Sequence, residues 1–173
     1  MTTIQASPKR VAIAGLGAIG LDLAQALAQG IPGYQLTAVS ARDLAAAKER
    51  LSHLKTEIAC VPLEELEAHA DLVIECAPAK LLSNAIGPFL KAGKTAIVLS
   101  CGALLTNQDL IDLAKQHHGQ IVVPSGALLG LDAVNAAAQG TIESVTMVTK
   151  KPVKGLLGAP YLEENNIDIA NIT

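Results

Sequence analysis

The sequence predicts an α/β fold built on a doubly wound parallel sheet. Short apolar runs alternate with helical patterns along most of the 173 residues, and these runs are continuously apolar. Continuously apolar strands are buried on both faces, so helices must cover both faces of the sheet. Connections this short make the crossovers right-handed. A third observation is the glycine-rich turn that joins the first strand to the first helix, which is typical of this fold class.

Six apolar runs are expected to form the strands. Between them, the spacing of apolar residues predicts the covering helices, the first with an apolar stripe that includes Ile19 and Leu27. Asp43 is expected to cap the second helix, and Thr106 with Asp109 resembles a capping box that opens a later one. The expected strands are residues 10–15, 35–40, 57–61, 71–77, 95–100 and 120–124.

Composition excludes several classes of function. The formal net charge is −3 and aromatic residues make up 2% of the chain, so no basic surface or stacking platform for nucleic acid is expected. No apolar stretch reaches the length of a membrane span, and the N-terminus lacks a secretory pattern. Cys60, Cys76 and Cys101 lie far apart, which predicts reduced thiols and no metal site. A cytoplasmic protein without nucleic-acid or membrane partners is predicted.

The glycine-rich turn fits the G-x-G-x-x-G pattern of dinucleotide-binding Rossmann domains. Gly15 would permit the tight turn, Gly17 would let a diphosphate approach the backbone, and Gly20 would allow close packing of helix on strand. The amides of the first helical turn, which includes Ala18 and Ile19, would hold the diphosphate together with the helix dipole. The alternative is a glycine-rich turn selected for packing alone.

The end of the second strand bears on the choice between NAD and NADP. An NAD-selective site would place a carboxylate there, whereas this chain has Ser40 and Arg42. Arg42 could pair with a 2′-phosphate and Ser40 could hydrogen-bond to it, so NADP is expected to be accepted, alongside NAD. Alternatively, Arg42 is a solvated charge or stacks on the adenine.

Small residues follow three further strands, where ligands of parallel sheets bind. They leave room for the ribose and nicotinamide, although small residues could also serve helix packing alone. Glu75 stands in the fourth apolar run. It is expected to lie at the rim, solvated or hydrogen-bonded, and the alternative is that it orients a loop or touches substrate. The expected cofactor contacts at these strand ends are Ala77, Pro78, Ser100, Gly102 and Ser125.

Two domains are expected. Residues 1–140 would form the dinucleotide-binding Rossmann domain, and residues 141–173 would begin a substrate and dimerisation domain that is incomplete. The segment "SVTMVTKKP" (144–152) alternates with period two, which predicts a half-exposed strand of an antiparallel sheet.

Four segments together resemble the L-aspartate dehydrogenase family. They are "DLVIECA" (71–77), "VLSCGAL" (98–104), "VPSGALLGLDAVNAA" (123–137) and "SVTMVTKKP" (144–152). The resemblance implies a homodimeric enzyme that reversibly deaminates L-aspartate to iminoaspartate with NAD(P), and it implies that Ala127 contacts the cofactor.

The catalytic acid–base is not assigned in this chain. The resemblance places it on a histidine that would lie beyond Thr173, which suggests a fragment. The four histidines present fall on or near surface helices and are not expected to be catalytic. The alternatives are a non-catalytic NAD(P)-binding module and a Rossmann oxidoreductase acting on another small acid or sugar. These histidines are His53, His69, His117 and His118.

Overall fold

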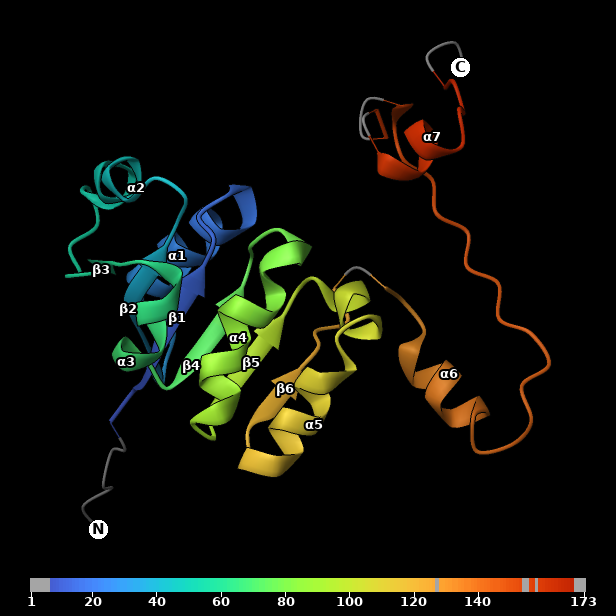
Figure 1. Ribbon diagram of the computed structural model, residues 1–173, viewed down its shortest axis with the longest axis horizontal. Coiled ribbons are helices and arrows are strands. Elements are labelled where there is room, and N and C mark those ends of the chain that lie inside the picture. Colours follow the sequence, from blue (N-terminus) through green and yellow to red (C-terminus); the bar gives the residue numbers. More distant parts are fainter. Residues whose placement is uncertain (1–6, 127, 154–155, 158, 170–173) are drawn as a thin grey trace. The chain divides into compact units, whose positions relative to one another are not determined.

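The computed structural model describes residues 7–126, 128–153, 156–157 and 159–169. The chain divides into two compact units, Met1–Gly126 and Ala127–Thr173. The first unit contains the sheet and five α-helices that pack on it (Figure 1). The expectation that a substrate domain begins at residue 141 stays a prediction.

The sheet has six strands, all parallel, in the order β3-β2-β1-β4-β5-β6. The chain begins in the middle of the sheet, builds outward to β3, and then crosses back to build β4, β5 and β6. This order confirms the predicted doubly wound parallel sheet. The strands are β1 (Lys9–Ala14), β2 (Tyr34–Ser40), β3 (Ala59–Cys60), β4 (Leu72–Glu75), β5 (Thr95–Val98) and β6 (Gln120–Val122).

Two hydrophobic clusters, one on each face of the sheet, hold the helices. Successive residues of β1 point to opposite faces, so Val11 and Ile13 belong to one cluster, whereas Ala12 and Ala14 belong to the other. Side chains of α1 and α2 pack in the first cluster, and side chains of α3, α4 and α5 pack in the second. These helices are α1 (Ala18–Gly30), α2 (Leu44–Leu51), α3 (Leu66–His69), α4 (Leu82–Lys91) and α5 (Gln108–His117).

Two details of the predicted helices differ in the structure. Ile19 is 59% exposed, and the buried residues of α1 are Gly20, Ala24 and Leu27, so the buried face is displaced from the predicted stripe. The predicted capping box is wrong as well. Thr106 follows a 3₁₀-helix, η3 (Cys101–Leu105), and its hydroxyl donates back to the Ala103 carbonyl at 3.2 Å instead of capping α5.

The predicted cap of α2 is confirmed. Asp43 Oδ1 accepts a hydrogen bond from the Ala46 amide at 2.9 Å. A side-chain acceptor at this position satisfies one of the amides that a helix leaves unpaired at its start. Two further 3₁₀-helices complete the first unit, namely η1 (Leu63–Glu65) and η2 (Ala79–Leu81).

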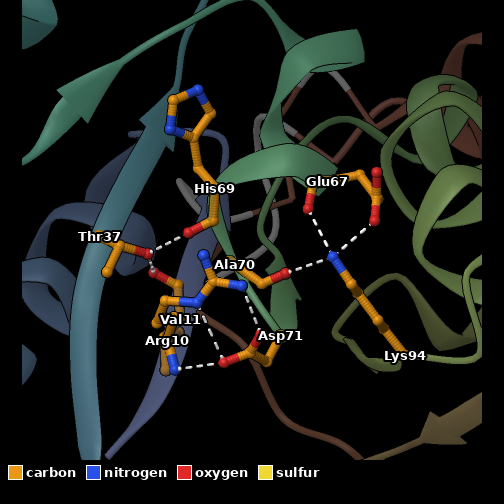
Figure 2. Close-up of polar contacts among 8 residues, drawn as sticks. All are labelled: Arg10, Val11, Thr37, Glu67, His69, Ala70, Asp71 and Lys94. Carbon is orange, nitrogen blue, oxygen red and sulfur yellow. Dashed lines mark hydrogen bonds and ion pairs between the residues drawn. The ribbon is translucent and has the colours of Figure 1, made fainter.

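Polar side chains tie together the edge of the sheet where the strands begin (Figure 2). Arg10 forms a two-pronged contact with Asp71, with Nη2 to Oδ1 at 2.6 Å and Nε to Oδ2 at 3.2 Å. Lys94 Nζ donates to the carbonyl oxygens of Glu67 and Ala70, both at 2.8 Å, and so covers the C-terminal end of α3. This edge is closed by contacts within the chain.

Among the described residues of the second unit, two short α-helices form, α6 (Leu131–Ala137) and α7 (Pro160–Glu164). The predicted strand at 144–152 is wrong, because these residues are exposed and form no strand. A strand requires a neighbour to bond its amides and carbonyls, and no strand follows β6 in the described residues. Within the described part of the chain, no helix has the length and apolar character needed to cross a membrane.

Candidate dinucleotide site

Two of the three motif glycines are required by close packing at the end of β1. Gly15 has φ of +101°, and a Cβ there would lie 2.6 Å from the carbonyl oxygen of Cys76. A Cβ on Gly20 would overlap the carbonyl oxygen of Gly15 itself. These contacts let α1 start directly over the strand end, as predicted for both residues.

No packing contact with the described protein requires a glycine at Gly17. Its φ of −73° suits any residue, and a Cβ built there meets nothing within 4 Å. The turn therefore has a glycine at a position where its backbone faces open space and no neighbouring protein atom requires one. This favours a ligand that approaches the backbone over selection for packing alone, and it fits a dinucleotide diphosphate.

The start of α1 offers amides to such a ligand. Gly17 is the N-cap residue, no side chain caps the helix, and the first helical hydrogen bond runs from the Leu21 amide to the Gly17 carbonyl at 3.0 Å. The amides of Ala18, Ile19 and Gly20 precede that bond and point out of the helix. The helix dipole adds a partial positive charge at this end.

A cleft of about 860 Å³ opens beside this turn, a volume within the usual range for small-molecule sites. Six predicted site residues line it: Gly15, Gly17, Ser40, Arg42, Ala77 and Pro78. The other predicted residues that the structure describes lie outside the lining, namely Ala18, Ile19, Gly20, Ser100, Gly102 and Ser125. Ala127 lies outside the described residues. Contact of any of them with a cofactor stays a prediction.

The charge of the cleft is mainly positive. Arg42, Arg50 and Lys80 line it together with one acidic residue, Asp43, whose Oδ1 is engaged in capping α2. Within the described residues, none of the three cations lies within 4 Å of a carboxylate oxygen. A cleft with unpaired cations favours an anionic ligand.

Sequence reasoning missed Arg50 and Lys80. Arg50 Nη1 donates to the carbonyl oxygen of Leu16 at 2.7 Å, so the last turn of α2 holds the glycine turn from a distance of 34 residues in sequence. No spacing rule relates these positions. Only the packing of α2 beside β2 brings Arg50 to the glycine turn. Lys80 lies on η2, directly after the predicted site residue Pro78. Its closeness to Pro78 in the sequence could have indicated that it lies near the site.

Glu75, the last residue of β4, is fully buried, which corrects the expectation of a solvated carboxylate at the rim. It is hydrogen-bonded, as the same expectation allowed. Its Oε2 accepts from the Ser100 amide at 2.9 Å, and its Oε1 accepts from the Ser100 hydroxyl at 3.0 Å. The carboxylate thus joins the ends of two neighbouring strands.

The cysteine beside Glu75 is not suited to nucleophilic chemistry. Burial, and secondly the negative charge of Glu75, raise the pKa of the Cys76 thiol to about 11. A thiol with so high a pKa is almost entirely protonated near neutral pH. Cys76 is therefore a packing residue of the cleft wall.

The fold and the cleft define a dinucleotide-binding domain of the Rossmann class. A family model described as "Homoserine dehydrogenase, NAD binding domain" matches residues 15–124, and the chain belongs to this family of NAD-binding domains. The resemblance to L-aspartate dehydrogenases is confirmed by known proteins. The chain is 53% identical to L-aspartate dehydrogenase of Bradyrhizobium diazoefficiens over 163 residues, which cover 94% of this chain and 58% of that protein.

Two further proteins extend this comparison. The chain is 53% identical to L-aspartate dehydrogenase 3 of Bordetella bronchiseptica, with 94% of this chain and 60% of that protein covered. The crystal structure of aspartate dehydrogenase from Thermotoga maritima superposes with a TM-score of 0.55 at 22% identity, covering 76% of this chain and 52% of that one, and shows the shared fold. The chain spans about 60% of the length of the curated relatives it matches.

Proposed function

We propose that this chain is the cofactor-binding part of an NAD(P)-dependent L-aspartate dehydrogenase. The observation that carries the cofactor site is Gly17, whose backbone faces open space between two glycines that packing requires. The identity of 53% to two L-aspartate dehydrogenases supports the substrate. In the proposed reaction the Cα–H bond of L-aspartate breaks with transfer of a hydride, and the amino group loses a proton, which leaves iminoaspartate.

The residues of the cleft fit the two ends of a dinucleotide. The amides of Ala18, Ile19 and Gly20 would hold the diphosphate, and the glycine turn that presents them is fixed by Arg50. Ser40 and Arg42 would bind a 2′-phosphate, so we propose that NADP is accepted alongside NAD.

The other half of the cofactor would lie over the ends of β4, β5 and β6. There we propose contacts from Ala77 and Pro78, and from the turn residues Ser100 and Gly102. Ser125 and Ala127 complete the proposed set. When bound, the nicotinamide supplies the hydride acceptor for the substrate.

The chain's partners and location follow as proposals. The substrate is a small amino acid or keto acid, and the active form is proposed to be a homodimer. The cysteines Cys60, Cys76 and Cys101 are free thiols, which supports a reducing compartment, and we propose the cytoplasm.

The test is reductive amination by the full product of the gene that encodes this sequence. Oxaloacetate and ammonium are supplied with NADH or NADPH, and loss of nucleotide absorbance is followed. Oxaloacetate-dependent oxidation of either nucleotide is the expected result. Binding of NAD(P)H without turnover would instead favour a non-catalytic module. Turnover with a different small acid or sugar would favour another oxidoreductase.

A further inference from the structure

Glu75 makes a contact that the proposed cofactor binding does not by itself explain. It ends the central strand β4, where it pairs with Ala14 of β1 and Val98 of β5, and its side chain is 0% exposed. Burying a carboxylate carries a large desolvation cost, and apolar residues fill the neighbouring positions of β4. Packing alone would be served as well by an apolar side chain.

Both hydrogen bonds of the carboxylate are made with one residue, Ser100, which follows the neighbouring strand β5. Both of its oxygens accept from Ser100, one from the amide at 2.9 Å and one from the hydroxyl at 3.0 Å. An ionised carboxylate only accepts hydrogen bonds, so it suits two donors on the same residue. This pair of bonds fixes the backbone and the side chain of Ser100 together.

The amide, hydroxyl and carbonyl of Ser100 are all hydrogen-bonded within the chain. Its carbonyl accepts from the Ala103 amide at 2.9 Å, and a second acceptor for its hydroxyl, the Ala77 carbonyl, lies at 3.4 Å. These bonds tie the turn after β5 to the turn after β4. The two turns lie on the half of the sheet over which the second mononucleotide of a bound dinucleotide is expected.

We infer that Glu75 is a positioning residue that sets the Ser100–Gly102 turn against the nicotinamide half of the cofactor. This inference rests on the proposed cofactor site. The adenine half would be held by a different set of residues, which line the cleft at the glycine turn and the end of β2. Glu75 therefore acts on one half of the ligand and not on the other.

The test compares the affinities of the full chain for two nucleotides, NADH and ADP. Dissociation constants for NADH and for ADP are measured by calorimetry for the wild type, Glu75→Gln and Ser100→Ala. Glu75→Gln keeps the shape but replaces one acceptor by a donor, and Ser100→Ala removes only the hydroxyl bond. Glu75→Gln is expected to weaken NADH by about tenfold and Ser100→Ala by less, since bonds to a charged acceptor are lost. ADP affinity should stay within about twofold of the wild type for both.

Nicotinamide fluorescence gives a second readout, because its enhancement on binding reports how well that ring is held. The enhancement should fall in Glu75→Gln. Glu67→Gln, a carboxylate change at the opposite edge of the sheet, is the matched control and should leave both affinities unchanged. Circular dichroism checks that each variant is folded, and Ser100→Ala keeps the test open if Glu75→Gln is not.

Three outcomes separate the possibilities. Parallel loss of NADH and ADP affinity would make Glu75 a general structural residue and overturn the inference. Equal affinity of the wild type for NADH and ADP would also overturn it, since the nicotinamide half would then contribute no binding, while the adenine site would stand. If the wild type binds neither nucleotide, the proposed cofactor site itself fails.

Discussion

The two edges of the parallel sheet treat their cations in opposite ways. At the edge where the strands begin, Arg10 is paired with Asp71, and Lys94 is paired with Glu67 and bonded to two carbonyls (Figure 2). At the edge where the strands end, Arg42 and Lys80 have no carboxylate partner within the described residues. The paired cations lie at one edge of the sheet, and the cations without a carboxylate partner lie at the other, an arrangement that favours an anionic ligand there.

Substitutions at the two edges are therefore expected to have different consequences. Residues at the closed edge contribute to folding, because their partners belong to the same chain. Arg42 and Lys80 at the open edge are expected to contribute to binding, because a cleft lined by cations without a carboxylate partner favours an anionic ligand. Several residues at the open edge are nevertheless needed for the fold itself, namely the two glycines that packing requires, Arg50 and Glu75.

The largest effect is expected for Gly20→Ala. The added Cβ would overlap the Gly15 carbonyl oxygen, a backbone atom that cannot move without shifting β1 or α1. Urea denaturation should show a loss of at least about 3 kcal/mol in the free energy of unfolding.

Gly17→Ala is the matched control for that variant. It meets no protein atom, so the free energy of unfolding should change by at most about 1 kcal/mol. Its NADH affinity should nevertheless fall by about tenfold or more, because the methyl group takes the space of the diphosphate. Normal NADH binding by folded Gly17→Ala would remove the main support for the site.

The fold was largely predictable because its signals are local. Continuous apolar runs, helical spacing and the turn at Gly15–Gly20 each lie within one short segment of sequence. The errors arose where an element depends on distant partners. Residues 144–152 alternate as a strand does, yet they have no neighbour to pair with in the described chain. Thr106 is the C-cap residue of the preceding 3₁₀-helix η3, and the sequence pattern did not indicate that helix.

The cleft was predictable in part for the same reason. Strand ends can be read from sequence, so Ser40, Arg42 and Ala77 were expected at one edge. Arg50 could not be, because its contact with Leu16 depends on how α2 docks. The Glu75–Ser100 pair also required the register of β4 against β5, in which Glu75 lies beside Val98.

Arg42→Ala should separate the two nucleotides at the open edge. If the guanidinium binds the 2′-phosphate, NADPH affinity should fall by about tenfold while NADH affinity changes by less than about twofold. Fluorescence titration measures both. Lys48→Ala, on α2 but outside the cleft lining, should change neither. Equal losses for both nucleotides would contradict phosphate recognition by Arg42.

Thr37→Val should affect stability and not binding. The Thr37 hydroxyl lies within reach of the His69 carbonyl at 2.9 Å and the Val11 carbonyl at 3.2 Å (Figure 2). Thr37 is the β2 residue that the register shift skips, because Leu36 pairs with Val11 and Ala38 pairs with Ala12. Removing the donor should lower the free energy of unfolding by about 1 kcal/mol in urea. Thr37→Ser keeps the hydroxyl and should lose less. A change in nucleotide affinity in Thr37→Val would show that the two edges are coupled.

The smallest effect is expected for Asp71→Asn, and its dependence on pH identifies its cause. The hydrogen bonds from the Arg10 side chain are the main reason why the pKa of Asp71 lies below its ordinary value. A carboxyl whose pKa is lowered in the folded state stabilises that state above its unfolded pKa, and this contribution is lost as pH falls through the lowered folded pKa. Urea midpoints of wild type and Asp71→Asn should therefore differ at pH 7 and converge in strong acid. Because the pair is exposed, with 46% and 41% of the two side chains accessible, added salt should also reduce the difference at pH 7. A difference that persisted unchanged in acid would show that Asp71 acts through packing rather than charge.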